Sequence, residues 1–235
     1  MAFFSWRDKN SRLILHHKVF YFYNNMDKNY PEKPQTMSIF VAKPKREVEK
    51  TLEQYDRIVQ ICQNLFLQKN RDYGTAWRIL RTTSLTDQLF IKARRIRSIE
   101  EKKVQKIGDS IESEFIGLVN YSALALIQLH LPVHAPLELD AAEATTLFQQ
   151  QLAQARALMI AKNHDYGEVW REMRVSSMTD LILMKLLRIK QIEDNNGQTE
   201  ISEGLDANYL DIINYAIFAL IKLHEQKSQA TDYQL

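Results

Sequence analysis

Lys185 and Arg188 are spaced like a pair of cations that could hold phosphate oxygens. They lie three residues apart, which puts both side chains on one face of a helix. A guanidinium group can donate two hydrogen bonds to one phosphate, whereas an ammonium group acts as a point charge. Asp211 and Asn214 repeat this spacing within a long apolar segment. Because a carboxylate rarely enters such a segment unless it is paired or bound to a metal, Asp211 is a candidate metal ligand.

Two further acids precede Asp211 and complete the predicted metal site. Glu203 and Asp206 are again three residues apart, at the start of the same segment. Oxygen ligands of this kind suit Mg²⁺, which usually takes one or two carboxylates together with water and substrate phosphates. We therefore predict that Glu203, Asp206 and Asp211 bind Mg²⁺ and serve as the catalytic acids. A second interpretation is that Glu203 and Asp206 only stabilise the positive end of a helix.

The aromatic candidates for nucleotide contact come from the stretch KNHDYGEVWREMR, residues 162–174. An acid, two aromatic residues and a glycine stand there between basic residues, with no obvious apolar face. The residues that we assign to nucleotide binding, with the cations included, are Lys92, Arg95, Asp165, Tyr166, Trp170, Arg171, Lys185, Arg188, Asn214 and Tyr215. Other interpretations stay open, since tyrosine and tryptophan at helical spacing are common in cores and Asp165 could cap a helix.

The chain contains this stretch twice. Residues 69–81 read KNRDYGTAWRILR and match residues 162–174 at an offset of 93 (162 − 69). The later matches are Lys92 with Lys185, Arg95 with Arg188 and, after one inserted residue, Asn120 with Asn214 at an offset of 94 (214 − 120). Two copies are too few for a repeat array, so we expect them to pack together as a pseudo-twofold pair.

Helices must position all of these residues. Apolar residues recur every three to four positions in each copy, and no segment has a convincing strand pattern. Each copy begins with an amphipathic helix that ends at Gly74 or Gly167, because glycine accepts a left-handed conformation. Asp140 is expected to cap the start of the second of these helices. The other predicted helices lie near 85–101, 110–130, 178–194 and 204–224. The predicted fold is an all-α, tandem-duplicated helical bundle with pseudo-twofold symmetry.

The predicted boundaries follow the duplication. They are a disordered leader or linker at 1–45, helical repeat 1 at 46–131, a linker at 132–144, helical repeat 2 at 145–226 and a flexible tail at 227–235. Residues 115–137 lack charge and are long enough to span a bilayer, but polar residues and prolines interrupt them, which favours a buried core helix. His130 and His224 end matching predicted helices, where capping is a simpler role than metal binding.

Composition limits the class of protein. The chain has 235 residues, of which 45% are apolar and 26% charged, as in ordinary soluble proteins. A net charge of +2 gives no strong attraction to nucleic acid or to a membrane. The lone Cys62 excludes an intrachain disulfide and a cysteine-cluster metal site. We expect a cytoplasmic protein, and a homo-oligomer is compatible with the sequence.

The repeated pattern resembles a known family. KNxDYGxxWR, a following KxxR helix and DxxNYA are similar to the bacterial and phage family called nucleotide modification associated domain, across about residues 50–224. More distantly, the pattern resembles the MazG-type all-α nucleotide pyrophosphohydrolases, which hold Mg²⁺ with acids from an ExxE helix and an ExxD helix. This chain departs from them, because it has no ExxE on the preceding helix and carries Asn214 where the final acid of ExxD would stand.

The resemblance implies nucleotide binding, and a modified deoxynucleotide triphosphate is one expected ligand. Whether the chain is an enzyme stays open. One interpretation is a Mg²⁺-dependent nucleoside triphosphate pyrophosphohydrolase; the others are a non-catalytic nucleotide-binding adaptor for modification enzymes and a structural helical protein. We expect copy two to carry the more complete site, because Gly117 stands in copy one where copy two has Asp211.

Overall fold

The fold is known from a computed structural model that describes residues 45–103, 108, 110–132, 134–198 and 203–232. The leader predicted for 1–45 lies outside this part of the chain, apart from Lys45. In chain order the helices are α2 (Lys45–Tyr73), η1 (Ala76–Ile79), α3 (Thr82–Lys102), α4 (Ile111–His130), α5 (Ala141–Tyr166), η2 (Val169–Glu172), α6 (Val175–Asp194) and α7 (Leu205–Asp232). No strand occurs among the described residues, and the all-α prediction is confirmed.

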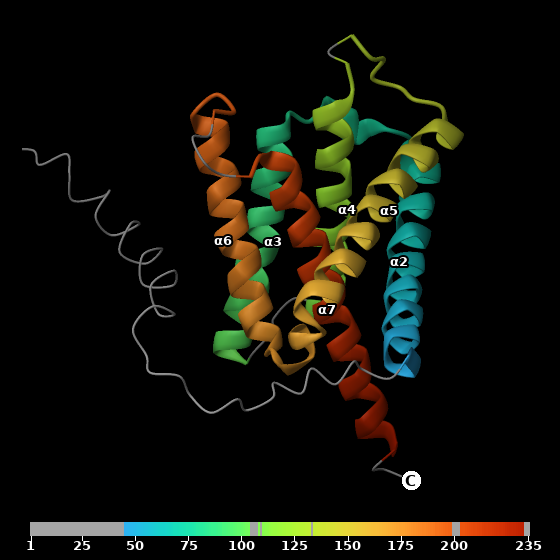
Figure 1. The fold of residues 1–235 in the computed structure, drawn as a ribbon. Helices are drawn as coiled ribbons and strands as arrows, with labels where there is room; N and C mark the ends of the chain where they lie inside the picture. Colours follow the sequence, from blue (N-terminus) through green and yellow to red (C-terminus); the bar gives the residue numbers. More distant parts are fainter. Residues whose placement is uncertain (1–44, 104–107, 109, 133, 199–202, 233–235) are drawn as a thin grey trace, which may run out of the picture. The chain divides into compact units, whose positions relative to one another are not determined.

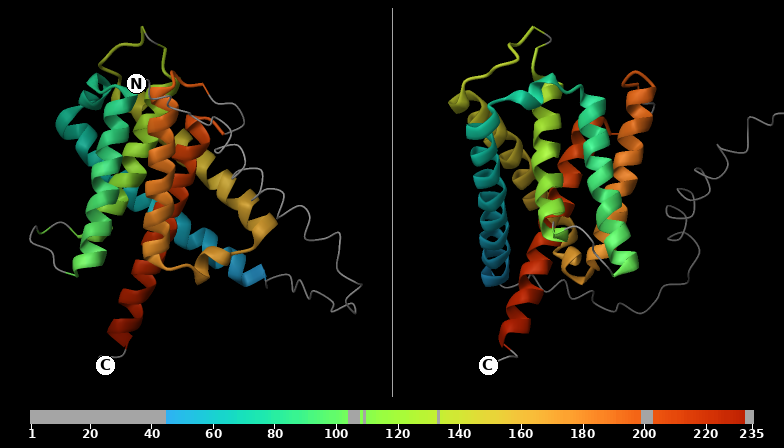
Figure 2. Two further views of the ribbon diagram at one scale, coloured as in Figure 1. Left: turned by 90° about the vertical axis from the view of Figure 1, so that its left-hand side faces the viewer. Right: turned by 180° about the vertical axis from the view of Figure 1, so that it is seen from behind.

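The long helices pack as three layers, and each layer takes one helix from each copy (Figure 1). α4 and α7 form the middle layer. α3 and α6 cover one side of it, and α2 and α5 cover the other, as the view from behind also shows (Figure 2). The middle position suits α4 and α7, because a helix that is apolar nearly all round is stable only when it is buried on several sides.

The outer helices α3 and α6 bury matching rows of apolar residues against this middle layer. The residues of each row recur every three or four positions, as expected for an amphipathic helix. The buried positions are Leu85, Leu89, Ala93 and Ile96 on α3, and Met178, Ile182, Leu186 and Ile189 on α6. Each residue of the second set lies 93 positions after its counterpart (178 − 85), so the duplication extends to the core.

The predicted helix ends are confirmed. The Asp140 carboxylate caps α5 by accepting hydrogen bonds from the backbone N–H groups of Ala142 at 2.9 Å and Glu143 at 3.3 Å. Gly74 and Gly167 follow the ends of α2 and α5 with φ angles of 55° and 68°. These positive angles strain any residue with a Cβ atom, which explains why both copies place glycine there.

Reciprocal contacts across the α3–α6 pair show the pseudo-twofold relation directly. Thr86 donates a hydrogen bond to Glu193 at 2.8 Å, and Thr179 donates one to Glu100 at 3.0 Å. The two contacts exchange equivalent residues, since Thr86 corresponds to Thr179 and Glu100 to Glu193 at the offset of 93 (179 − 86). Glu193 therefore contacts the other copy and does not lie with Asp211.

Two ion pairs between the same helices are related in the same way, with equivalent residues of the two copies as partners. Arg97 lies 3.1 Å from Asp180, and Lys190 pairs with Asp87. Arg97 corresponds to Lys190 and Asp87 to Asp180 (180 − 87 = 93). Because each pair joins one copy to the other, the two repeats form a single bundle.

The partly buried Glu100 and Glu193 should make stability depend on pH. Burial raises the pKa of Glu100 and of Glu193, and the hydrogen bonds from the threonines offset this effect only in part. A raised pKa in the folded state stabilises the fold at low pH, and this contribution is lost as the pH rises through that pKa. Glu100→Gln with Glu193→Gln should therefore raise Tm at pH 7, with a difference that shrinks toward pH 4.

Thermal unfolding across that pH range measures the effect. Glu143→Gln, which removes the same charge from an exposed position of α5, is the control. A double variant that melts below the wild type at pH 7 would contradict the burial argument.

Two predicted boundaries shift in the structure. α5 begins at Ala141 within the predicted linker, because Asp140 starts the helix. α7 continues to Asp232, past the predicted end of repeat 2 at 226, because residues 225–231 contain no glycine or proline to stop a helix. Among the described helices, none combines the length and apolar character that crossing a bilayer requires.

Candidate functional site

Asp211 is the centre of the most strongly charged buried group in copy two. The carboxylate is buried on α7, with only 7% of its side chain exposed. Lys162 Nζ donates to Asp211 Oδ1 at 2.5 Å from α5, and Lys185 Nζ lies 2.7 Å from Asp211 Oδ2 on α6. Three helices therefore meet at this acid. Because two ammonium groups hold its two oxygens, its charge is already compensated by the protein.

Lys162, Glu203 and Tyr215 surround this centre. Glu203 Oε2 lies 3.7 Å from Lys185 Nζ, and its side chain is 63% exposed. Burial opposes the charge of Lys162, but the hydrogen bond to Asp211 and the nearby negative charge together outweigh this effect, and the pKa of Lys162 is raised. Burial and the Asp211 charge raise the pKa of the Tyr215 phenol. Lys162 therefore stays charged and Tyr215 stays neutral around pH 7.

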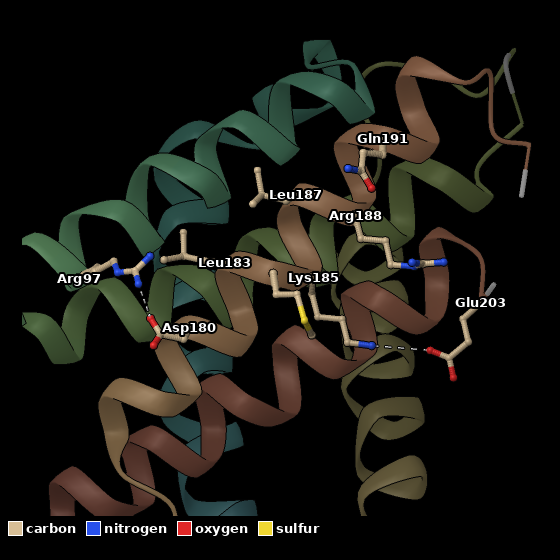
Figure 3. Close-up of a pocket in the computed structure, with 9 residues that line it drawn as sticks. Arg97, Asp180, Leu183, Lys185, Leu187, Arg188, Gln191 and Glu203 are labelled. Carbon is tan, nitrogen blue, oxygen red and sulfur yellow. Dashed lines mark ion pairs between the residues drawn. The ribbon is translucent and has the colours of Figure 1, made fainter. Parts of the chain in front are cut away.

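A pocket of about 820 Å³ opens beside Lys185, and Arg188 lines it without a polar partner (Figure 3). The wall residues that matter here are Met184, Lys185, Leu187, Arg188, Gln191 and Glu203. Figure 3 shows that the side chains of Lys185 and Arg188 extend to the same side of α6. Within the described residues Arg188 makes no hydrogen bond or ion pair. The pocket therefore offers an uncompensated guanidinium group to an anion.

Asp206 does not lie with Asp211. Its carboxylate lies 2.9 Å from Nε2 of His130, the last residue of α4. Glu112 and His224 make the equivalent contact at 2.7 Å, and Glu112 corresponds to Asp206 at the offset of 94 (206 − 112). His224 lies inside α7, so the predicted capping role does not apply to it. Both histidines instead join one copy to the other.

The three predicted metal ligands are therefore separated. Asp206 faces His130, Asp211 is held by two lysines, and Glu203 is the most exposed of the three. Among the described side chains, no group of three or more histidine, cysteine, aspartate or glutamate residues is placed to hold a metal ion. The donor set predicted for Mg²⁺ is not assembled by this fold.

The side chain of Asn214 makes hydrogen bonds inside the core. Its amide donates to the backbone carbonyl of Ala155 at 3.0 Å and accepts from the Tyr55 hydroxyl at 2.8 Å. The equivalent Asn120 donates to the Cys62 carbonyl at 3.1 Å. Since both amides tie a middle helix to an outer one, Asn214 lies away from the pocket.

Trp170 and Arg171 anchor η2. Trp170 is buried and stacks on Phe218 with ring centroids 4.3 Å apart. Arg171 donates to Glu168 at 2.9 Å and to Gln54 at 2.8 Å, and it also reaches Thr51 and Glu225. With its donors engaged in this way, Arg171 is a structural residue, and the predicted nucleotide contact is not available to it in this conformation.

Asp165 and Tyr166 end α5 at the surface. Tyr166 is 70% exposed, and Asp165 lies 3.0 Å from His164. Asp165 stands in the last turn of the helix, so the alternative N-terminal capping role does not apply. Both residues are accessible to a ligand, and they follow Lys162 within one turn of the same helix.

Copy one contains a closed version of the same cationic pair. Lys92 Nζ lies 3.2 Å from Glu114 Oε2, and Arg95 pairs with the other carboxylate oxygen. Glu114 is buried, with 6% of the residue exposed. Neither cation is therefore left for a ligand without breaking a buried ion pair.

The residue-by-residue assignment missed Lys162 and Glu114. Lys162 belongs to the repeated stretch, but nothing in its spacing shows that it faces Asp211 from another helix. Glu114 could have been found, because the offset of 94 aligns it with Asn208 (208 − 114) and shows that a charge differs between the copies.

A comparison with protein families identifies one match. The family model described as nucleotide modification associated domain 1 matches residues 69–129 and 162–223, together just over half of the chain. The two segments cover the equivalent parts of the copies and leave out most of α2 and α5. Among curated proteins and among solved structures, nothing matches the chain. The resemblance to MazG-type pyrophosphohydrolases thus stays a prediction.

Proposed function

The chain belongs to the nucleotide modification associated domain 1 family, and from this premise we propose that copy two binds the phosphate groups of a nucleotide. The name of the family connects the chain with nucleotide modification. The contacts of the pocket support a more specific function. Its ligand is proposed to be a nucleoside triphosphate or a related phosphorylated nucleotide, including modified deoxynucleotides.

The observation that carries this proposal is the lack of a partner for Arg188. In the described structure its guanidinium group lines the pocket unpaired, next to the ammonium group of Lys185. A planar guanidinium group beside a point charge suits the oxygens of a phosphate chain. The pocket volume of about 820 Å³ falls within the range of about 300–1,000 Å³ for small-molecule sites.

The apolar wall of the pocket supports contact with a base or sugar. Met184 and Leu187 line it, and each is 53% exposed. Large apolar side chains exposed beside cations form a surface on which a flat ring can lie while its phosphates reach the charges. Met184 and Leu187 are compatible with several bases, because an apolar side chain makes no hydrogen bond that selects one base edge.

In this proposal Mg²⁺ is bound by the phosphates of the nucleotide and arrives with them. The three predicted ligands do not fit a metal site held by the protein, for the reasons of geometry given above. Glu203 is exposed and lines the pocket, so it is the carboxylate that could meet an ion carried by the nucleotide. We derive no reaction step through the metal.

Binding without turnover is the form of this function that the site supports best. Hydrolysis needs a carboxylate that can orient or deprotonate water, and Asp211 is neutralised by Lys162 and Lys185. An adaptor for modification enzymes fits this arrangement. Pyrophosphate release that depends on Glu203, measured with Glu203→Gln, would instead favour the hydrolase.

Arg188→Gln should weaken nucleoside triphosphate binding by about 10–100-fold, because a hydrogen bond to a charged group contributes about 1.5–3 kcal/mol. Isothermal titration calorimetry with and without Mg²⁺, over a panel that includes modified deoxynucleotides, measures the change. The matched control is Arg94→Gln, which removes the same group from an exposed position of α3 that has no polar partner in the described structure.

Two outcomes would count against this function. Equal losses in Arg188→Gln and Arg94→Gln would mean that net charge, and not the pocket, governs binding. A wild-type protein that binds no member of the panel would reject the nucleotide site in copy two.

A further inference from the structure

Two of the differences between the middle helices of the two copies belong together. Copy one has Glu114 and Gly117 on α4, three residues apart. Copy two has Asn208 and Asp211 at the equivalent positions of α7, at the offset of 94 (211 − 117). Each copy therefore has one acid facing its cations, but the acid of copy two lies about one turn further along the helix.

In copy one the acid is placed between both cations. The Glu114 carboxylate is buried and engages Lys92 with one oxygen and Arg95 with the other. Two oxygens of a single planar anion held by an ammonium and a guanidinium group are also the arrangement that a phosphate would adopt between these cations. Glu114 thus occupies the place of a ligand.

Gly117 allows this arrangement. A Cβ atom at position 117 would lie 2.9 Å from Cδ and Cε of Lys92, so the lysine side chain fills the space that a larger residue would take. In copy two, Asp211 takes that space and binds Lys185 at 2.7 Å. Lys185 therefore pairs with an acid that lies about one turn further along α7 than Asn208.

Arg188 is the cation that this exchange leaves without a partner. Its counterpart Arg95 pairs with Glu114, whereas Asn208 carries no charge. The Asn208 amide donates to the Gly204 carbonyl at 2.7 Å, and its buried Oδ1 atom has no hydrogen-bond partner in the described structure. Position 208 thus holds a buried amide oxygen without a donor, where copy one holds a carboxylate paired with two cations.

We propose that Glu114 is a built-in anion that closes the site of copy one, so that the chain binds one nucleotide phosphate group, in copy two. This inference rests on the proposed nucleotide function and adds its stoichiometry and the placement of the phosphate. The phosphate lies beside Arg188 at the position that the Glu114 carboxylate takes beside Arg95. The duplication has thus produced one open site and one site filled by the protein itself.

Glu114→Asn tests this inference by giving copy one the residue of copy two. Calorimetric titration with tripolyphosphate, and in parallel with a nucleoside triphosphate, should change from one site per wild-type chain to two per variant chain. Adding Arg95→Gln should remove the second site again. Glu143→Gln, which removes a charge from the surface of α5, should leave one site. One site in the wild type and still one site in folded Glu114→Asn would overturn the inference.

The reverse variant covers the case in which Glu114→Asn does not fold. Asn208→Glu with Asp211→Gly gives copy two both residues of copy one, so that a carboxylate can reach Lys185 and Arg188 as Glu114 reaches Lys92 and Arg95. The double variant should abolish binding of both titrants in copy two. Unchanged binding by this variant would overturn the inference.

Failure of the inference is distinguishable from failure of the proposed function. A wild-type chain with no site, together with a Glu114→Asn chain with one site, would reject nucleotide binding by copy two and support closure of copy one. One site in both chains would support the function and reject the closure.

Discussion

Asp211→Asn should lower the free energy of unfolding by about 2–3 kcal/mol and at the same time tighten the binding of nucleoside triphosphates. The first effect arises because the buried carboxylate holds Lys162 and Lys185, and breaking a buried ion pair costs about 3–5 kcal/mol. Lys162 is 44% exposed and can regain water, so we expect less than the full cost. The second effect arises because Lys185 becomes available to the pocket.

Apo melting curves and nucleotide titrations of the same variant measure both effects. Asp206→Asn is the matched control, since it removes the same charge from an exposed pair with His130. If the two aspartates shared a metal ion, both variants would weaken Mg²⁺-dependent nucleotide binding. Weaker nucleotide binding in both variants would therefore contradict the role of Asp211 as an ion-pair partner of the two lysines and would favour the metal interpretation.

Helical periodicity was sufficient to predict the bundle, and the residue matches at an offset of 93 were sufficient to predict its duplication. Core positions such as Leu85 and Met178 repeat at the same spacing in both copies. This spacing can be read from the sequence, because burial of apolar surface stabilises the fold and so places apolar residues on the buried face of each helix. Asp140 and Gly167 could be placed at the ends of α5 because caps depend on local geometry. Contacts within one turn of a helix can thus be predicted from the sequence.

The site was harder to predict, because its residues come from three helices. Spacing along α7 gives the face on which Asp211 lies but not the helix that this face meets, so its pairing with Lys162 could not be foreseen. The separation of Asp206 from Asp211 was visible in the sequence. Asp206 and Asp211 are five residues apart, and at about 3.6 residues per turn they differ by about 140° around the helix. Two side chains so oriented do not converge on one small ion.

The repeated DYGxxWR stretch has a structural role that its assignment to nucleotide contacts did not include. Its tryptophan and arginine are present in both copies, although Glu114 closes the cationic pair of copy one. The structure accounts for this distribution, because Arg171 anchors η2 and its counterpart Arg78 anchors η1. A residue needed for folding is kept in every copy, whereas a ligand contact is needed only where the ligand binds.

Arg78→Met should therefore lower the free energy of unfolding by about 2–4 kcal/mol. Arg78 is 6% exposed and donates to the backbone carbonyls of Ala135 at 3.2 Å and Pro136 at 3.3 Å, as well as to Gln128. Methionine keeps much of the side-chain volume but supplies no donor, so these acceptors lose their partner, at a cost of about 1–3 kcal/mol for each one that water cannot reach. Chemical denaturation monitored by circular dichroism measures the loss.

Arg81→Met is the control, because Arg81 is exposed and its side chain has no polar partner in the described residues. It should change stability little, since surface substitutions usually stay within about 0.5 kcal/mol. The folded Arg78→Met protein should also bind nucleotide with the Kd of the wild type, because the arginine ties η1 to the segment between the copies and lies on no wall of the α6 pocket. A variant that keeps its apo stability but loses nucleotide binding would show that the repeated arginine contacts the ligand and that the open site lies in copy one.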